Sequence, residues 1–148
     1  MADNPTQREP QYVGFWKRVL AFLIDSVILL TILLIAAVAI YGRQYIELST
    51  QGKTLLFDIL VQGVLPALAA ILFWRYRGAT PGKMLIGAKI VDARTLGKPS
   101  TGQLVGRYFA YIVSMFFMLG FVWIAFDKRK QGWHDRLAGT VVVVDGDD

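Results

Sequence analysis

Four charged residues of this chain lie beside or inside apolar stretches, where a charge could do chemistry: Arg18, Asp25, Arg107 and Asp135. Arg18 and Asp25 are seven residues apart, which on a helix places them within about 20° of one face and about 10 Å apart along the axis. A carboxylate inside a membrane is unfavourable, so it usually faces protein or water and has a partner. The spacing therefore predicts that both residues lie on a stripe that faces away from lipid.

The partner of Asp25 is predicted from the direction of helical side chains. Such side chains lean towards the helix N-terminus, so a direct ion pair between Asp25 and Arg18 would be stretched. Arg107 begins the third apolar segment from the side on which Arg18 begins the first, so we expect it to reach Asp25 laterally. Asp135 would then neutralise Arg18 if the tail returns to that face. The prediction is a neutral cluster in the cytoplasmic third of the membrane.

Two roles for Asp25 stay open. Desolvation favours its neutral form and a nearby arginine favours its charged form, so it could titrate in a range useful for proton- or cation-coupled transport. Alternatively, it stays ionised beside arginine and fixes the register of the helices. Asp58 and Gln62 are either interfacial or line a pathway.

Other candidate motifs favour structural roles. Thr80–Lys83 lacks the spacing and the final hydroxyl of a phosphate-binding loop, so we interpret it as a turn. The single histidine, His134, is expected to be a hydrogen-bond partner. There is no cysteine, and no set of residues is spaced for a metal, a hydrolytic triad or a dinucleotide. We therefore expect no metal, no cofactor and no enzymatic activity.

The composition indicates that the surrounding elements lie in a membrane. The 148 residues suit one domain, and 55% of them are hydrophobic. After Arg18 only Asp25 interrupts an apolar run that exceeds the about 20 residues a transmembrane helix needs. We predict an uncleaved first helix from about Phe15 to Tyr41, preceded by a flexible polar tail at residues 1–13.

A second transmembrane helix is predicted from about Leu55 to Trp74. Pro66 lies in its middle and removes one backbone donor, so we expect a kink there. Small residues on one face, Gly63, Ala67 and Ala70, would let another helix approach closely.

Basic residues indicate the orientation. The loop at residues 42–54 has two, Arg43 and Lys53, whereas the following loop has six: Arg75, Arg77, Lys83, Lys89, Arg94 and Lys98. By the positive-inside rule the crowded loop is cytoplasmic, and so is the N-terminus. Basic residues next to apolar runs indicate contact with anionic lipid headgroups and not with nucleic acid.

The third apolar segment, Tyr108–Phe126, is ambiguous because Gly120 divides it and a basic cluster follows it. It could span the membrane or re-enter it on the cytoplasmic side. The β-rich Thr140–Val144 could pair with Lys89–Val91, which favours a cytoplasmic C-terminus. The predicted fold is an all-α integral membrane protein with two transmembrane helices, a third transmembrane or re-entrant segment, and short β segments in the cytoplasmic loop and tail. The membrane domain would cover residues 14–144, before an acidic tail at 145–148.

Three segments together resemble the RDD family of small membrane proteins, named for one arginine and two aspartates. They are GFWKRVLAFLID, GATPGKMLIGAKIVD and WHDRLAGTVVV, and the resemblance runs from about Tyr12 to Val144. Arg18 and Asp25 match the first two family positions, and we map the second aspartate onto Asp135. The resemblance implies a small bacterial protein of the cytoplasmic membrane. Cation or proton exchange has been suggested for the family, and other members resemble accessory partners of membrane enzymes.

Two functions are therefore expected as alternatives. The first is cation- or proton-coupled transport through the Arg and Asp cluster. Two or three segments cannot surround a water-filled path, so transport would require a homo-oligomer that contacts through the small residues of the second helix. The second is a non-transporting adaptor that stabilises or inhibits a larger membrane protein and acts through the loop at residues 77–101.

Overall fold

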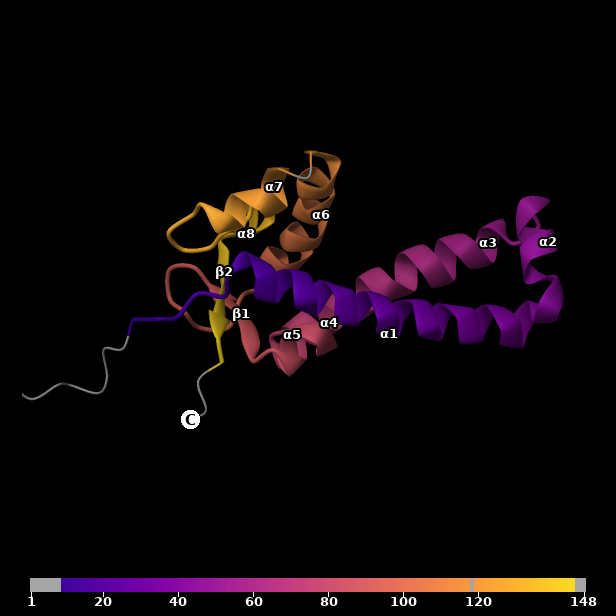
Figure 1. The fold of residues 1–148 in the computed structure, drawn as a ribbon, viewed down its shortest axis with the longest axis horizontal. Coiled ribbons are helices and arrows are strands. Elements are labelled where there is room, and N and C mark those ends of the chain that lie inside the picture. Colours follow the sequence, from indigo (N-terminus) through magenta and orange to yellow (C-terminus); the bar gives the residue numbers. More distant parts are fainter. Residues whose placement is uncertain (1–8, 118, 146–148) are drawn as a thin grey trace, which may run out of the picture.

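The computed structural model describes residues 9–117 and 119–145 of the chain. They form a long helical hairpin, residues 15–77, and a head made of residues 78–145 with residues 9–14 (Figure 1). The first eight residues of the expected polar tail, and all of the acidic tail except Asp145, lie outside the described residues.

The first arm of the hairpin is one continuous helix, α1 (Phe15–Tyr41), with the predicted bounds. Gly42 ends it with a positive φ of 65°, a conformation that glycine adopts without strain. The chain then turns through η1 (Gly42–Gln44) and α2 (Tyr45–Thr50) at the end of the hairpin farthest from the head (Figure 1).

The second arm combines α3 (Leu55–Phe57), the π-helical stretch η2 (Asp58–Val64) and α4 (Leu65–Arg77). Pro66 is the second residue after η2 and cannot donate to the carbonyl four residues before it, which lies within η2, so we attribute the widened turn to this missing hydrogen bond. We expected a kink at Pro66 itself. The distortion instead lies in the turn before the proline. The helix continues past the predicted Trp74 to Arg77, and Gly78 ends it in the left-handed conformation.

Both arms are long and apolar enough to cross a bilayer by length and composition. The candidate spans are Phe15–Thr50 and Leu55–Leu85, and only 6% of the most apolar window of each is buried within the molecule. The two arms therefore cover little of one another's apolar surface.

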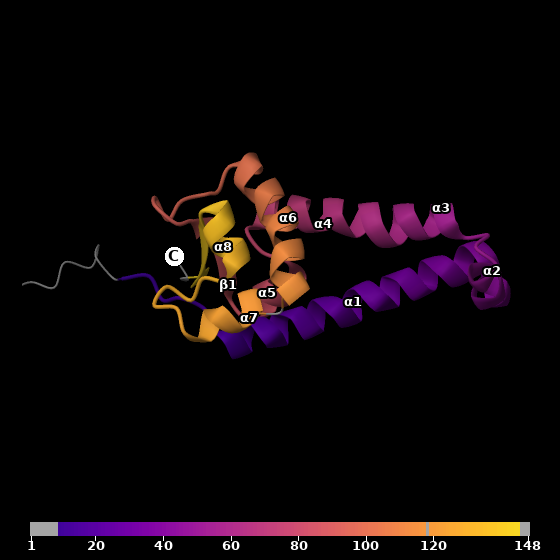
Figure 2. The same cartoon turned by 90° about the horizontal axis from the view of Figure 1, so that it is seen from above.

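The head contains the remaining helices and strands. In chain order they are α5 (Pro81–Leu85), β1 (Ala88–Asp92), α6 (Thr101–Phe117), α7 (Leu119–Val122), η3 (Trp123–Ala125), α8 (Trp133–Ala138) and β2 (Thr140–Val144). In both Figure 1 and Figure 2, α6 runs across the direction of α1 and α4. The segment is therefore oriented differently from the two candidate spans.

A two-stranded antiparallel sheet, formed by β1 and β2, also contacts the segment before α1. Ile90 of β1 is opposite Val142 of β2 in its register. Tyr12 bridges Val143, and the Val13 amide donates to the Val142 carbonyl at 2.9 Å. Tyr12 and Val13, which we assigned to a flexible tail, are thus held against β2, because burial of the apolar Val13 side chain favours this position.

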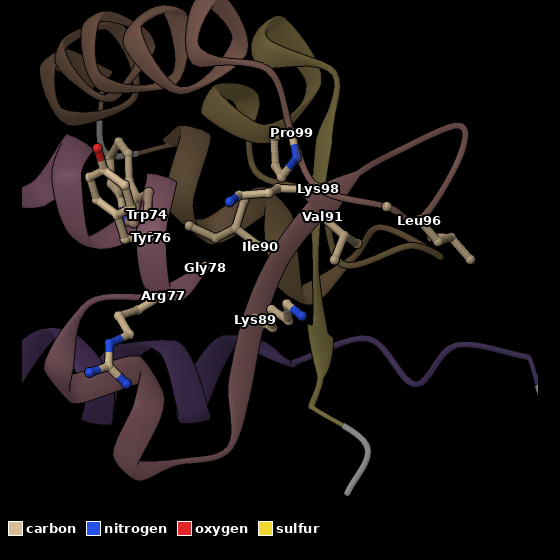
Figure 3. Close-up of a pocket in the computed structure, with 11 residues that line it drawn as sticks. Trp74, Tyr76, Arg77, Gly78, Lys89, Ile90, Val91, Leu96, Lys98 and Pro99 are labelled. Carbon is tan, nitrogen blue, oxygen red and sulfur yellow. The ribbon is translucent and has the colours of Figure 1, made fainter. Parts of the chain in front are cut away.

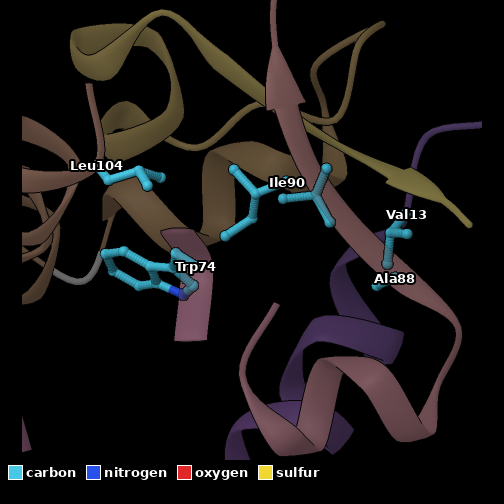
Figure 4. Packing of buried hydrophobic residues seen from close by; sticks show 6 residues of the cluster. Val13, Trp74, Ala88, Ile90 and Leu104 are labelled. Carbon is cyan, nitrogen blue, oxygen red and sulfur yellow. The ribbon is translucent and has the colours of Figure 1, made fainter. Parts of the chain in front are cut away.

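The hydrophobic core lies where the sheet meets the end of α4 (Figure 4). Its buried members come from five segments: Val13, Trp74, Ala88, Ile90, Leu104 and Val142. Full burial of an aliphatic side chain such as Ile90 contributes about 1.5–3 kcal/mol, so this core holds the head on the second arm.

Two glycines allow the chain to fold back after α6. A Cβ on Gly120 would lie 2.6 Å from the Ser114 Oγ, and one on Gly132 would lie 2.9 Å from the Gly120 carbonyl oxygen. The absence of both side chains lets α7 and the start of α8 pack against α6, so the described part of the third segment reverses direction near Gly120.

Candidate functional site

The carboxylate of Asp135 is at the centre of a buried charge cluster. Asp135 lies in the first turn of α8, and its side chain is fully buried. The amide of Gly132, the residue that precedes this helix, donates to Asp135 Oδ2 at 2.9 Å. This hydrogen bond fixes the rotamer, so the carboxylate points at the two arginines.

Arg18 connects α1 to this carboxylate. Its Nη1 lies 2.6 Å from Asp135 Oδ2, as we expected from the sequence. Its Nε donates to the Val13 carbonyl at 3.1 Å, and its Nη2 donates to the Lys130 carbonyl. Arg18 leans towards the N-terminus of α1, the usual direction for a helical side chain, and this direction carries it into the head.

Arg107 approaches the same carboxylate from α6. Its side chain is fully buried, and its Nη1 forms an ion pair with Asp135 Oδ1. The same nitrogen donates to the Thr140 hydroxyl at 2.8 Å, and Nη2 donates to the Tyr111 hydroxyl at 3.2 Å. Asp135 thus joins α1 and α6 to α8.

Asp25 lies outside this cluster, which corrects the expected contact with Arg107. Its Oδ2 accepts a hydrogen bond from the Thr80 hydroxyl at 2.5 Å, and its Oδ1 accepts one from the Gly82 amide at 2.7 Å. These donors belong to the start of α5, whose first amides have no partner within the helix. Asp25 therefore anchors α5 to α1.

The close approach of α5 explains why Asp25 has these partners. A Cβ on Gly82 would lie only 2.1 Å from the Ala21 carbonyl oxygen. Only glycine permits this contact, and it places the α5 amide next to the carboxylate. The turn that we predicted at Thr80–Lys83 is therefore the first part of a short helix docked on α1.

Three residues that sequence reasoning missed complete the cluster: Trp74, Lys83 and Tyr111. The Arg107 guanidinium lies 5.6 Å from the Trp74 ring centroid and 5.4 Å from that of Tyr111. The Lys83 Nζ lies 5.8 and 5.9 Å from the same two rings. Tyr111 could have been found, because it is four residues after Arg107 and so shares its helix face. The position of Lys83 depends on the docking of α5.

The cluster is more positive than the predicted set of two arginines and two aspartates. One aspartate, Asp135, contacts both arginines, and Lys83 adds a further buried cation. Backbone carbonyls receive hydrogen bonds from Arg18, and aromatic faces lie next to Arg107 and Lys83. Cation–π contacts and carbonyl acceptors thus take the place of the second carboxylate.

The charges of the arginines dominate the electrostatics of Asp135. Burial by itself would raise the pKa of its carboxyl, but the charges of Arg107 and Arg18 outweigh burial and hold that pKa well below its usual range. Burial also lowers the pKa of His134 well below its usual value, so the imidazole is neutral at pH 7. His134 Nδ1 lies 3.2 Å from the Ser114 hydroxyl, consistent with the structural role expected for it.

Asp58 and Gln62 form a separate polar network at the far end of the hairpin. Asp58 Oδ1 accepts hydrogen bonds from the Tyr45 hydroxyl at 2.7 Å and the Gln62 amide at 2.6 Å. The Thr54 hydroxyl donates to Oδ2 at 2.8 Å. This network joins the turn to η2 and lies at the opposite end of the hairpin from the Arg18 cluster (Figure 1). Among the described residues, no group of three or more His, Asp or Glu is arranged to hold a metal ion.

The model of the RDD family matches residues 12–139, which is most of the chain. The chain belongs to the RDD family. In this RDD protein the arginine and the second aspartate assigned from the motif, Arg18 and Asp135, are in direct contact, whereas Asp25 contacts α5.

Relatives of this RDD protein occur in bacteria. It is 43% identical over 103 residues to "Uncharacterized protein RP437" of Rickettsia prowazekii, a match that covers 68% of this chain and 58% of that protein. It is 32% identical to "Uncharacterized protein YxaI" of Bacillus subtilis, over 88% of this chain and 95% of the relative. "Uncharacterized membrane protein YteJ" of the same organism is 29% identical, over 89% and 80%. No solved structure gives a significant match. The family and the two apolar helices support a membrane location.

Proposed function

We propose that this RDD protein crosses the bacterial cytoplasmic membrane twice, with its head and both described chain ends on the cytoplasmic side. The far end of the hairpin carries two basic residues, Arg43 and Lys53, whereas the head is rich in lysine and arginine. The positive-inside rule then assigns the head to the cytoplasm. The crosswise orientation of α6 supports an interfacial position for the third segment (Figure 2).

Within this topology, we propose that the protein is a membrane adaptor and not an enzyme. The observation that carries the proposal is that the charges of Arg18, Arg107 and Asp135, and that of Asp25 outside their cluster, are engaged in internal contacts. Arg18 and Arg107 share Asp135, and Asp25 is bound to the start of α5. These contacts join the head to the hairpin, which is what a rigid adaptor needs.

The surface of the hairpin supports a protein partner in the bilayer. A Cβ on Gly63 would meet nothing within 4 Å, so this small residue leaves room for a neighbouring helix. Ala70, on the face that we expected to contact another helix, instead packs against the hydrophobic core of its own chain. The contact surface that we propose is therefore the part of the second arm around Gly63, together with exposed α1.

Photo-crosslinking in intact cells tests the adaptor. A photoreactive residue would replace Ile35 of α1 or Leu68 of α4, both exposed, and Arg94 of the head would serve as the control position. We expect one larger membrane protein to be captured from both hairpin positions and not from Arg94. Crosslinks to lipid alone from both hairpin positions would contradict the proposal, and crosslinks to a second copy alone would favour a homo-oligomer.

Cation- or proton-coupled transport by a homo-oligomer is the second candidate. It is favoured by the Asp58 network, which sets a carboxylate beside a π-helical stretch of the second span. Single π-helical turns inside helices frequently occur at functional sites. In this alternative Asp58 and Gln62 line the path, and copies of the hairpin surround it.

Cation flux into proteoliposomes under a pH gradient tests transport. The comparison is between wild type, Asp58→Asn and Asp25→Asn, with the exposed Asp145→Asn as the control. Transport predicts a flux above that of empty liposomes that Asp58→Asn removes and Asp145→Asn leaves unchanged. No flux from folded wild-type protein would remove this candidate.

A further inference from the structure

A basic pocket lies where the second arm enters the head. It has a volume of about 240 Å³ and is walled by the end of α4, by β1 and by the loop before α6 (Figure 3). Three cationic side chains from these three segments line it: Arg77, Lys89 and Lys98. The residues that line the pocket include no aspartate or glutamate.

Among the described residues, none forms an ion pair with these three cations. Within the part of the chain that the structure describes, the ion pairs involve other residues, and no side-chain hydrogen bond engages Arg77, Lys89 or Lys98. The carboxylate of Asp92, which follows the β1 residues of the pocket, accepts from the Arg94 amide at 2.8 Å and the Gln103 Nε2 at 2.7 Å. Asp92 therefore makes its hydrogen bonds outside the pocket, and the charged residues that line the pocket are all basic.

The wall of the pocket holds Lys89 and the loop of Lys98 in place. A Cβ on Gly78 would lie 3.0 Å from the Lys89 Cγ, so the stem of Lys89 packs over the end of α4. The rim includes Leu96 with a positive φ of 58°, a conformation uncommon for a residue with a side chain. The loop that carries Lys98 is tied to β1, because the Asp92 amide donates to the Gly97 carbonyl at 2.9 Å.

The pocket lies next to the apolar surface of the second arm. Trp74 and Tyr76 line it, and the side chain of Tyr76 is 75% exposed. Leu72 and Phe73, immediately before them, are also exposed. Aromatic residues at the end of an apolar helix are typical of the headgroup level of a membrane. A ligand here could place an anionic group among the cations and apolar chains along α4.

We propose that this pocket binds the phosphate of an anionic phospholipid from the leaflet next to the head. The phosphodiester lies among Arg77, Lys89 and Lys98, and the acyl chains extend along the exposed face of α4. Basic pockets at the cytoplasmic side of transmembrane helices bind such headgroups. A soluble phosphate shares the anionic chemistry but makes no use of the adjoining apolar surface.

The test is a lipid titration of the full-length protein in neutral detergent, with bound lipid measured by native mass spectrometry. The probes are short-chain phosphatidylglycerol, short-chain phosphatidylcholine and inorganic phosphate. The pocket variant is Arg77→Gln with Lys98→Gln. The matched control, Arg94→Gln with Lys128→Gln, removes the same charge from exposed head positions outside the pocket.

We expect wild type and the control to bind one phosphatidylglycerol in preference to phosphatidylcholine. The pocket variant should bind it about 25-fold more weakly, because each cation near an anionic lipid contributes about fivefold. Equal weakening in both variants, or equal binding of the two lipids, would overturn the proposal. If inorganic phosphate binds as tightly as phosphatidylglycerol, the proposal that the ligand is a phospholipid is wrong. If the double variant is unstable, Lys98→Glu alone provides the same test and should also weaken phosphatidylglycerol binding.

Discussion

At the scale of single residues, Asp135 stabilises the head because it forms ion pairs with arginines of two helices, α1 and α6. Its carboxylate binds Arg18 and Arg107, and Arg107 is fully buried with its Nε lacking a described partner. A buried arginine without a carboxylate is strongly unfavourable. The stability of the head therefore depends on this one side chain more than on any exposed charge.

Asp135→Asn tests that dependence. Loss of the negative charge leaves two arginines facing a neutral amide, and breaking a buried pair costs about 3–5 kcal/mol. We expect a corresponding decrease in the free energy of unfolding in mild detergent, measured by denaturant titration. Asp145→Asn removes the same charge at an exposed position and should change this free energy little; similar losses in the two variants would contradict the assignment.

Gly82 is the second residue on which the arrangement depends. Gly82→Ala introduces a Cβ 2.1 Å from the Ala21 carbonyl oxygen, so α5 must move away from α1 and from Asp25. Overpacking of this kind costs about 1–3 kcal/mol, which thermal unfolding in detergent would detect. In Gly106→Ala, within α6, the Cβ meets nothing within 4 Å, so this control should be neutral or stabilising. Loss of stability from Gly106→Ala alone would show that the steric argument is wrong.

At the scale of elements, α6 joins the buried cluster to the exterior. Its inner face carries Leu104, Arg107 and Ser114, all fully buried, and its outer face carries Phe109 and Ile112, both exposed. This two-faced pattern is typical of a helix that lies on a boundary between protein and lipid. The exposed apolar face explains why α6 resembles a transmembrane helix in sequence, although it runs across the direction of α1 and α4 (Figure 2).

The turn that joins β1 to α6 should respond to acid through Asp92. Hydrogen bonds to its carboxylate from the Thr95 amide first, and then from Gln103 and the Arg94 amide, lower the pKa of Asp92 from 3.8 to about 2. A carboxyl whose pKa is lower in the folded state stabilises the fold above its unfolded pKa and loses this effect as the pH falls. Wild type should therefore be more stable to heat than Asp92→Asn above pH 3.8, and this difference in stability should disappear between pH 3.8 and about pH 2. Thermal unfolding of both proteins across that range measures it, and a difference that stays constant would contradict the assignment.

At the scale of the whole molecule, the head gathers segments that are far apart in the chain. Residues 9–14, the loop after α4 and the C-terminal strand meet at one end of the hairpin (Figure 1). A membrane that contains the hairpin must therefore leave these segments on one side. Two crossings satisfy this geometry, whereas a third complete crossing would separate β2 from β1.

Single-cysteine labelling tests this topology, because the chain has no native cysteine. Lys53→Cys should react with an impermeant maleimide in intact cells, whereas Arg94→Cys and Asp145→Cys should react only after permeabilisation. Each variant needs a permeabilised sample as its control for reactivity. Labelling of Asp145→Cys in intact cells would contradict the two-crossing topology.

Helix α1 shows what local sequence can predict. Its bounds match the expected Phe15–Tyr41, because length and hydropathy are properties of one continuous segment. Asp25 shows the opposite. Its expected partner was Arg107, but its carboxylate accepts hydrogen bonds from Thr80 and Gly82. This contact forms because Gly82 has no side chain, which allows α5 to dock against α1.

The sequence by itself determined two apolar helices, the family, and the concentration of basic residues in the loop after the second helix. Each follows from residues close together in the chain or from motif spacing. Only the tertiary structure decided which charges meet, that Lys83 joins Trp74 and Tyr111, and that a basic pocket forms beside α4. Arg18 and Asp135 are 117 residues apart, and whether such residues touch depends on how whole elements pack, which no local pattern encodes.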